Sequence, residues 1–119
     1  MTADPLAVLD VAALDRQTGG DASLRDEIVR MFLEDCPLRV EAIAASIASG
    51  DVAALTSSSH TLKGSAAYLK AATVRECAAD LERCGREARL ADAPAAFDRL
   101  RAAVGDLLPE LQKLQNLNA

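Results

Sequence analysis

Apolar residues recur along this chain at intervals of three and four, the spacing that places them on one face of an α-helix. Two stripes are especially regular. The first consists of Ile28, Phe32, Cys36, Val40, Ile43 and Ile47. The second consists of Phe97, Leu100, Val104, Leu107, Leu111 and Leu114. No segment shows the strict alternation of a half-buried strand, so the pattern predicts an all-α protein.

Short polar breaks separate the first three predicted helices. A leading helix covers residues 6–17 and ends before "GGD", where Asp21 is placed to cap a second helix. The segment "SGD" at residues 49–51 then ends the second helix. We expect Gly50 to adopt the left-handed conformation there and Asp51 to cap the third helix.

The later breaks are marked by other residues. The third helix is expected to continue to about Ala71, and Thr73 with Glu76 three residues later predicts a capping box for the fourth. The segment "ADAP" supplies the last break, with Asp92 or Ala93 as the cap of the fifth helix and proline in its first turn.

Four long amphipathic helices joined by short breaks favour an antiparallel up-and-down four-helix bundle with a short additional N-terminal helix. A chain of 119 residues is long enough to bury one core. We therefore expect a single domain over residues 1–119, with an N-terminal cap segment at 1–20 and the helical bundle at 21–117.

The charge of the chain narrows the choice of partner. The formal net charge is −5 and the sequence pI is about 4.8, which argues against nucleic acid and anionic membranes as partners. No apolar run approaches the ~20 residues of a membrane span, and the first ten residues lack the basic start of a signal peptide. We expect a cytoplasmic monomer that binds another protein.

The candidate chemistry is sparse. Cys36, Cys77 and Cys84 show no metal-ligand spacing with a histidine, so no metal is expected and the thiols are interpreted as core or boundary residues. The chain has no glycine-rich phosphate loop and no Ser-His-Asp order, so we expect no ATP site and no cofactor.

The single histidine, His60, lies within the third predicted helix. Because a helix turns about 100° per residue, Leu55, Leu62 and Leu69 lie about 140° to 200° around the axis from His60. The leucines should therefore face the core and the imidazole should face solvent. A core histidine is disfavoured by this geometry, whereas an idle surface histidine is not excluded by spacing alone.

Small side chains surround His60 on the helical wheel: Thr56, Ser57, Gly64 and Ala67 fall within about 60° of it. A glycine in mid-helix costs about 1 kcal/mol relative to alanine, which suggests that another molecule approaches the backbone closely here. Lys63 follows three residues after His60, within reach of a group attached to the ring. A neutral imidazole is a competent nucleophile, and Lys63 could compensate a phosphoryl group on it. These features suggest phosphoryl carriage.

The segment "HTLKGSAAYLKAATVRECAADLE" resembles the signature of histidine-containing phosphotransfer (HPt) domains of multistep phosphorelays. The likeness rests on His60, Leu62, Lys63, Gly64 and Cys77, with "DLE" on the next helix. The upstream "FLEDCPLRVEAIAASIASGD" is similar to the family's second helix, so the resemblance extends from about Met31 to Glu82.

The resemblance implies an up-and-down four-helix bundle in which His60 is phosphorylated on Nε2, Lys63 supports the phosphoryl oxygens and Gly64 clears space for docking. It implies transfer between the receiver-domain aspartates of a hybrid histidine kinase and a response regulator, with Mg²⁺ held only by the receiver. The docking surface is expected to include Gly64, Ser57, Thr56, Ala67 and Lys70. Lys70 is a departure, because many members have glycine at that position.

Three other interpretations remain open on the sequence alone. The chain could be a degenerate bundle that binds receivers without carrying phosphate, although the presence of His60 and Lys63 argues against this. It could be the dimerisation and phosphoacceptor segment of a histidine kinase, which an ATP-binding domain should follow. It could also be an enzyme that uses His60 as a general base, which requires a carboxylate or nucleophile nearby in the fold.

Overall fold

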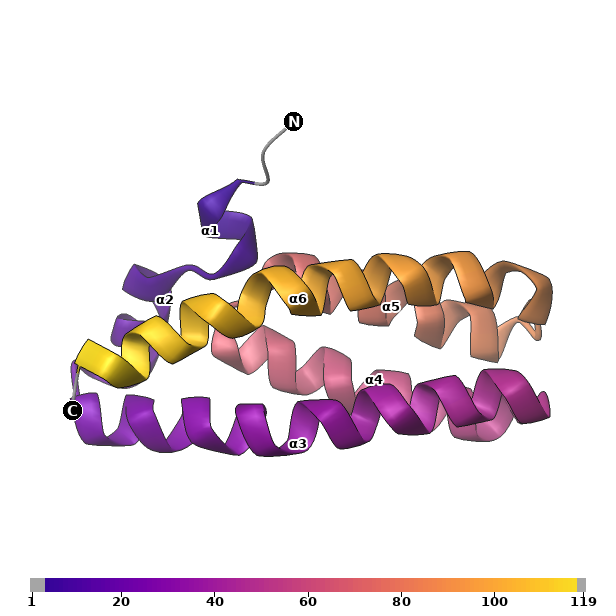
Figure 1. The fold of residues 1–119 in the computed structure, drawn as a ribbon, viewed down its shortest axis with the longest axis horizontal. Coiled ribbons are helices and arrows are strands. Elements are labelled where there is room, and N and C mark those ends of the chain that lie inside the picture. The colour runs from indigo at the N-terminus through magenta and orange to yellow at the C-terminus, as the bar shows by residue number, and fades with distance from the viewer. Residues whose placement is uncertain (1–3, 118–119) are drawn as a thin grey trace.

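The computed structural model describes residues 4–117, and within that range every regular element is a helix. The elements are α1 (Pro5–Val8), α2 (Val11–Gln17), α3 (Ala22–Ser49), α4 (Val52–Leu69), α5 (Ala72–Arg86), the 3-10 turn η1 (Leu90–Asp92) and α6 (Ala93–Leu117). Helices α3 to α6 run alternately up and down as a bundle (Figure 1). The prediction of an all-α antiparallel four-helix bundle is therefore confirmed. Residues 1–3 and 118–119 of the predicted domain lie outside the described residues.

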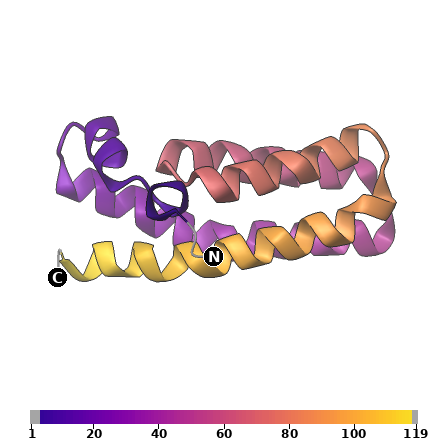
Figure 2. The ribbon, with the colours of Figure 1, turned by 90° about the horizontal axis from the view of Figure 1, so that it is seen from above.

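The predicted leading helix is two short helices instead of one. Leu9 is extended, with φ −157° and ψ 118°, and Asp10 starts α2 by accepting a hydrogen bond from the backbone N–H of Ala13. The N–H of Asp10 in turn donates to the carbonyl of Lys70 at the α4–α5 turn, at 3.0 Å. This contact holds the N-terminal segment at one end of the bundle (Figure 2).

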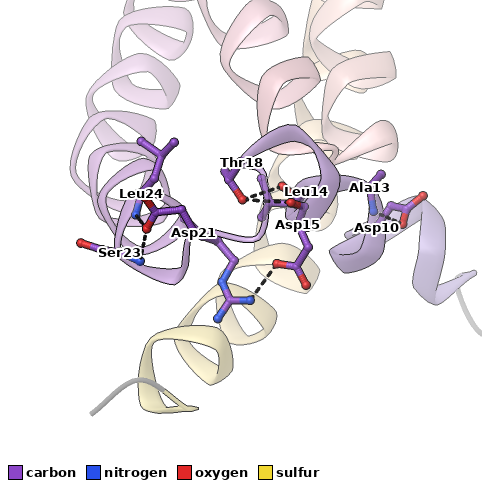
Figure 3. A network of polar contacts seen from close by, with 9 residues as sticks. Asp10, Ala13, Leu14, Asp15, Thr18, Asp21, Ser23 and Leu24 are labelled. Atoms are coloured by element: carbon purple, nitrogen blue, oxygen red, sulfur yellow. Dashed lines mark hydrogen bonds and ion pairs between the residues drawn. The ribbon is translucent and has the colours of Figure 1, made fainter.

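A side-chain cap at the start of α3 and an ion pair between α2 and α3 fix the turn between these helices (Figure 3). The carboxylate of Asp21 accepts hydrogen bonds from the N–H groups of Ser23 and Leu24, at 3.0 and 3.1 Å. Arg25 on α3 reaches back to Asp15 on α2 at 2.8 Å. The predicted cap at Asp21 is confirmed, because the aspartate satisfies two of the otherwise free N–H groups at the helix start.

The α3–α4 turn also follows the sequence prediction. Gly50 is left-handed, with φ 72°, and Asp51 accepts a hydrogen bond from the N–H of Ala54. The α4–α5 turn does not. Helix α4 ends at Leu69 instead of Ala71, because Lys70 adopts the left-handed conformation, with φ 69°.

The predicted capping box at Thr73 and Glu76 is wrong. Hydrogen bonds from the N–H groups of Lys70 and Ala71 to the carbonyls of Ala67 and Ala66 close α4 early. Helix α5 therefore begins at Ala72, after an N-cap residue that makes no side-chain hydrogen bond. Thr73 and Glu76 both lie inside α5.

Leucine and alanine make up most of the bundle core. On α4, Leu55, Leu62 and Leu69 are at most 1% exposed. Cys36 and Cys84 are buried as well, and burial, assisted by Asp35, raises the pKa of Cys36 to about 11. Such a thiol is held in its unreactive form.

Two structural features of the described residues bear on function. Among residues 4–117, no group of three or more His, Cys, Asp or Glu side chains could hold a metal ion. In the same part of the chain, no helix is long and apolar enough to cross a bilayer.

Candidate functional site

His60 lies in the middle of α4 and projects outward, with 64% of its side chain exposed. The helix orients it this way because the leucines on the opposite side fill the core. The predicted outward orientation of His60 is confirmed, and the core-histidine interpretation is excluded.

A buried carboxylate on α5 holds the inner edge of the imidazole. Oε2 of Glu82 lies 3.0 Å from Nδ1 of His60, and the Glu82 side chain is only 4% exposed. An ionised carboxylate can only accept, so Nδ1 carries the hydrogen that is donated. In a neutral ring the other nitrogen, Nε2, then keeps its lone pair and is available to an electrophile.

Two cations share the same carboxylate. Nζ of Lys63 lies 2.6 Å from Oε1 of Glu82, and Arg86, one turn further along α5, forms an ion pair with Oε2. Burial alone would raise the pKa of Glu82, but hydrogen bonds from Lys63 and His60 and the charges of Lys63 and Arg86 outweigh it, so the pKa lies below its usual value. Glu82 is therefore a permanent anion at neutral pH.

The residues predicted to surround His60 fall into two groups. Ser57, Gly64 and Ala67 are exposed on the same side of α4, and a Cβ built at Gly64 meets no atom within 4 Å. Thr56 is half-buried instead, because it packs against Gly85 of α5, and its hydroxyl donates to the carbonyl of Val52 at 2.7 Å. The expectation that Thr56 lies on the open face is therefore wrong.

Lys70 does not extend the side of α4 that carries Lys63. It ends the helix in the left-handed conformation, and it lines a cavity of about 340 Å³ with Leu6, Asp10 and Arg75. Glycine would suit this position better than lysine, because glycine adopts positive φ without steric cost.

An apolar groove of about 560 Å³ lies between α3 and α4. Met31, Leu38 and Tyr68 line it and are 59%, 63% and 49% exposed, while the carboxylates of Glu34 and Asp35 also line it. Tyr68 stands two turns beyond His60 on α4 and about 80° around the helix from it. This surface was not predicted from the sequence.

Glu82 and Arg86 were also not predicted as parts of the site, and Glu82 was noted only within "DLE". A signal was present, because Glu82 follows Ala78 and Leu81 along the inward face of α5, where a carboxylate needs a partner. The spacing of four residues between Glu82 and Arg86 is that of a helical ion pair.

Comparisons with known proteins concern the family and the fold of the chain. The model of the Hpt domain family matches residues 27–114. The fold is similar to the HPt domain of an Hpt sensor hybrid histidine kinase from Shewanella, with a TM-score of 0.82 and 19% identity over 94% of this chain and 97% of that one.

It is also similar to histidine-containing phosphotransfer protein B (HptB) from Pseudomonas aeruginosa PAO1, with a TM-score of 0.81 and 19% identity over 95% of this chain and 93% of that one. A comparison with curated protein sequences finds no match. Both structural likenesses concern the fold, whereas the family model matches the larger part of the sequence and includes His60, so the chain belongs to the Hpt domain family.

Proposed function

We propose that this protein is a histidine phosphotransfer protein in which Nε2 of His60 carries a phosphoryl group between receiver-domain aspartates. Membership of the Hpt domain family supports this role. The observation that carries the assignment to His60 is its geometry: a 64% exposed imidazole whose Nδ1 donates to a buried anion at 3.0 Å. This arrangement presents the Nε2 lone pair to solvent.

The transfer step follows from this arrangement. The Nε2 lone pair attacks the phosphorus of an aspartyl phosphate, and the bond between phosphorus and the aspartate oxygen breaks with its electron pair returning to the carboxylate. The hydrogen on Nδ1 stays in place, so the phosphorylated ring carries a positive charge that Glu82 compensates. Transfer onward reverses these bond changes. No proton has to enter or leave His60 in either direction.

Lys63 and Arg86 have different roles in the proposed transfer. Lys63 is 33% exposed and can turn from Oε1 of Glu82 toward a phosphoryl group on the ring, which offers a charge-assisted contact. Arg86 remains on Oε2, so Glu82 keeps a partner when Lys63 moves. We infer that the chain is a phosphoryl carrier without an ATP site of its own, and the Mg²⁺ that assists transfer is expected on the receiver.

The partners are receiver domains of a hybrid histidine kinase and of a response regulator. A receiver must bring its aspartate in line with Nε2, and the small exposed residues Ser57, Gly64 and Ala67 leave room for its active-site loops. The apolar groove at Met31, Leu38 and Tyr68 adjoins this surface and offers the contact area that an interface needs. Lys70 and Thr56 contribute less in this arrangement.

The test is labelling of the purified protein by a phosphorylated receiver domain, followed by acid and base treatment. We expect an acid-labile, base-stable label on the wild type and none on His60→Gln. The fold of His60→Gln should be intact by circular dichroism and urea unfolding, because an exposed side chain contributes little packing. Undiminished labelling of folded His60→Gln would refute the assignment.

The His60–Glu82 pair would also suit a general base, which is the strongest alternative. A general base needs a bound substrate whose proton lies within about 3 Å of it. The apolar groove between α3 and α4 is lined by Tyr68 and Ser65 of α4 but not by His60. His60 faces open solvent instead, which favours a nucleophile that meets a phosphoryl group on another protein.

A further inference from the structure

A close approach between α4 and α5 lies one helical turn from the His60–Glu82 pair. A Cβ built at Gly85 would overlap Oγ1 of Thr56 and would lie only 2.9 Å from the backbone nitrogen and 3.1 Å from the Cα of Thr56. Ordinary Cβ contacts are 3.4–4 Å. Because two of these three atoms belong to the backbone, they cannot rotate away, and α4 would have to shift to admit a methyl group.

The other glycines inside helices are different. A Cβ at Gly64 or at Gly105 meets no atom within 4 Å. Glycine in a helix interior is generally destabilising, so a steric reason for it is informative. Of these three helical glycines, only Gly85 is required by packing. The backbone of α4, the helix that carries His60, leaves no room there for a Cβ.

The register of the two helices links this contact to the site. Thr56 precedes His60 by four residues on α4, and Gly85 follows Glu82 by three residues on the antiparallel α5. The Gly85–Thr56 contact and the Glu82–His60 hydrogen bond therefore lie about 5 Å apart along the helix axes. A change in helix separation at one is passed to the other, because an α-helix does not flex appreciably over one turn.

We propose that Gly85 is a positioning residue, which through Thr56 sets the separation of α4 and α5 at which Glu82 reaches Nδ1 of His60. The inference rests on the proposed function of His60 and goes further, since it identifies what fixes the tautomer. If Glu82 no longer holds Nδ1 at 3.0 Å, the neutral ring can exchange its hydrogen between the two nitrogens. In the tautomer that carries it on Nε2, that nitrogen has no lone pair for phosphorus.

The single histidine makes this measurable, because imidazole nitrogen signals in the NMR spectrum can come only from His60. We expect long-range ¹H–¹⁵N spectra of the wild type at a pH where the ring is neutral to show the Nδ1–H tautomer. Gly85→Ala should show a mixture of tautomers. Its rate of phosphorylation by phosphoramidate should fall several-fold, because only the fraction of rings in the Nδ1–H tautomer has a lone pair on Nε2.

Gly105→Ala is the matched control, because it adds the same methyl group to a mid-helix glycine of α6 where no atom lies within 4 Å. Its spectrum and rate should equal those of the wild type. If Gly85→Ala does not fold, it is measured in the Lys70→Gly background, in which glycine replaces a left-handed lysine. A folded Gly85→Ala protein with the wild-type tautomer and rate would overturn the inference.

The two proposals can fail separately. A wild-type protein with the expected tautomer but no labelling by phosphoramidate or by a receiver would refute the proposed function while the spectrum still decides the role of Gly85. A wild type that shows both tautomers would refute the positioning role even if His60 is phosphorylated.

Discussion

Helix α4 meets its two neighbours in different ways. Toward α5 it meets the buried carboxylate of Glu82 and the backbone of Gly85. Toward α3 it forms an apolar groove in which Met31 and Leu38 remain largely exposed. One contact is closed and polar, and the other is open and apolar.

The difference separates two requirements of phosphoryl transfer. Orientation of the imidazole needs a rigid partner at a fixed distance, and the α5 contact supplies that partner. The buried carboxylate and the helical glycine in this contact reduce the stability of the fold. Binding of a second protein needs accessible apolar area, which the α3 contact supplies. We therefore expect substitutions on the α5 side to affect reaction with every phosphoryl donor. Substitutions on the α3 side should affect only protein donors.

The largest effect is expected for Glu82→Gln, on the α5 side. The amide can keep the shape of the side chain, but it removes the charge-assisted hydrogen bond to His60 and the anion that compensates the phosphorylated ring. A loss of about 1.5–3 kcal/mol corresponds to a reduction of about 10- to 100-fold. Rates with phosphoramidate and with a phosphorylated receiver, measured separately, should fall together. A loss with the receiver alone would contradict the division between the two sides.

The same variant has a pH signature in unfolding experiments. The pKa of Glu82 is lower in the folded protein than in the unfolded chain, so its contribution to stability is present above about pH 4.5 and is lost as the pH falls through the folded-state value. Urea unfolding at pH 7, 5 and 3 should show a steeper loss of stability for the wild type than for Glu82→Gln. Parallel curves would mean that the Lys63 and Arg86 contacts do not stabilise the anion.

The second prediction concerns the α3 side and uses Tyr68→Ser. Removal of one exposed aromatic anchor from an interface costs about 1–2 kcal/mol, so transfer from a receiver should slow about ten-fold. The reaction with phosphoramidate should not change. Leu6→Ser is a suitable control, because Leu6 is 63% exposed on α1 but does not line the α3–α4 groove. Equal rates of transfer from a receiver to Tyr68→Ser and to the wild type would show that the groove is not part of the interface.

Gly64 gives a third and smaller effect, because its surroundings are open. Gly64→Ala should raise stability by about 0.5–1 kcal/mol, as expected for an ordinary helical position where nothing lies within 4 Å. Gly64→Gln should fold equally well yet accept phosphate several-fold more slowly from a receiver, because its side chain occupies space near Nε2. Reaction with phosphoramidate should be much less affected. Equal losses with both donors would mean that Gly64 shapes the site itself.

How far the sequence predicts this molecule depends on where the deciding contacts lie. Helix starts at Asp21 and Asp51 and the turn at Gly50 were predicted correctly, because caps and left-handed glycines are local signals. The exposure of His60 followed from the leucine spacing on its own helix. The inward position of Glu82 on α5 could be recognised from the sequence, but its partners could not. The roles of Glu82 and Gly85 depend on which helix packs against α5 and in what register, and periodicity does not specify that.

Lys70, at the α4–α5 turn, shows the same limit of prediction from the sequence. Lys70 and Gly50 have nearly the same backbone conformation, with φ 69° and ψ 36° against φ 72° and ψ 22°, and the residue after each donates to a carbonyl in the last turn of the preceding helix. Only the glycine could be recognised as a helix stop. The lysine is forced into the same shape by the chain reversal, so the helix predicted from the sequence was two residues too long.

The last prediction tests whether the left-handed conformation of Lys70 at the α4–α5 turn reduces the stability of the fold. A left-handed conformation costs a residue with a Cβ about 1–2 kcal/mol, so Lys70→Gly should stabilise the protein by about 1 kcal/mol, or raise its Tm by about 4 °C. The carbonyl that accepts from Asp10 belongs to the backbone and should remain in place. The reverse exchange, Gly50→Lys, is the matched control and should destabilise by a similar amount. An unchanged or lower midpoint for Lys70→Gly would mean that the lysine side chain makes contacts that offset the strain, and the two turns would then be equivalent in energy as well as in shape.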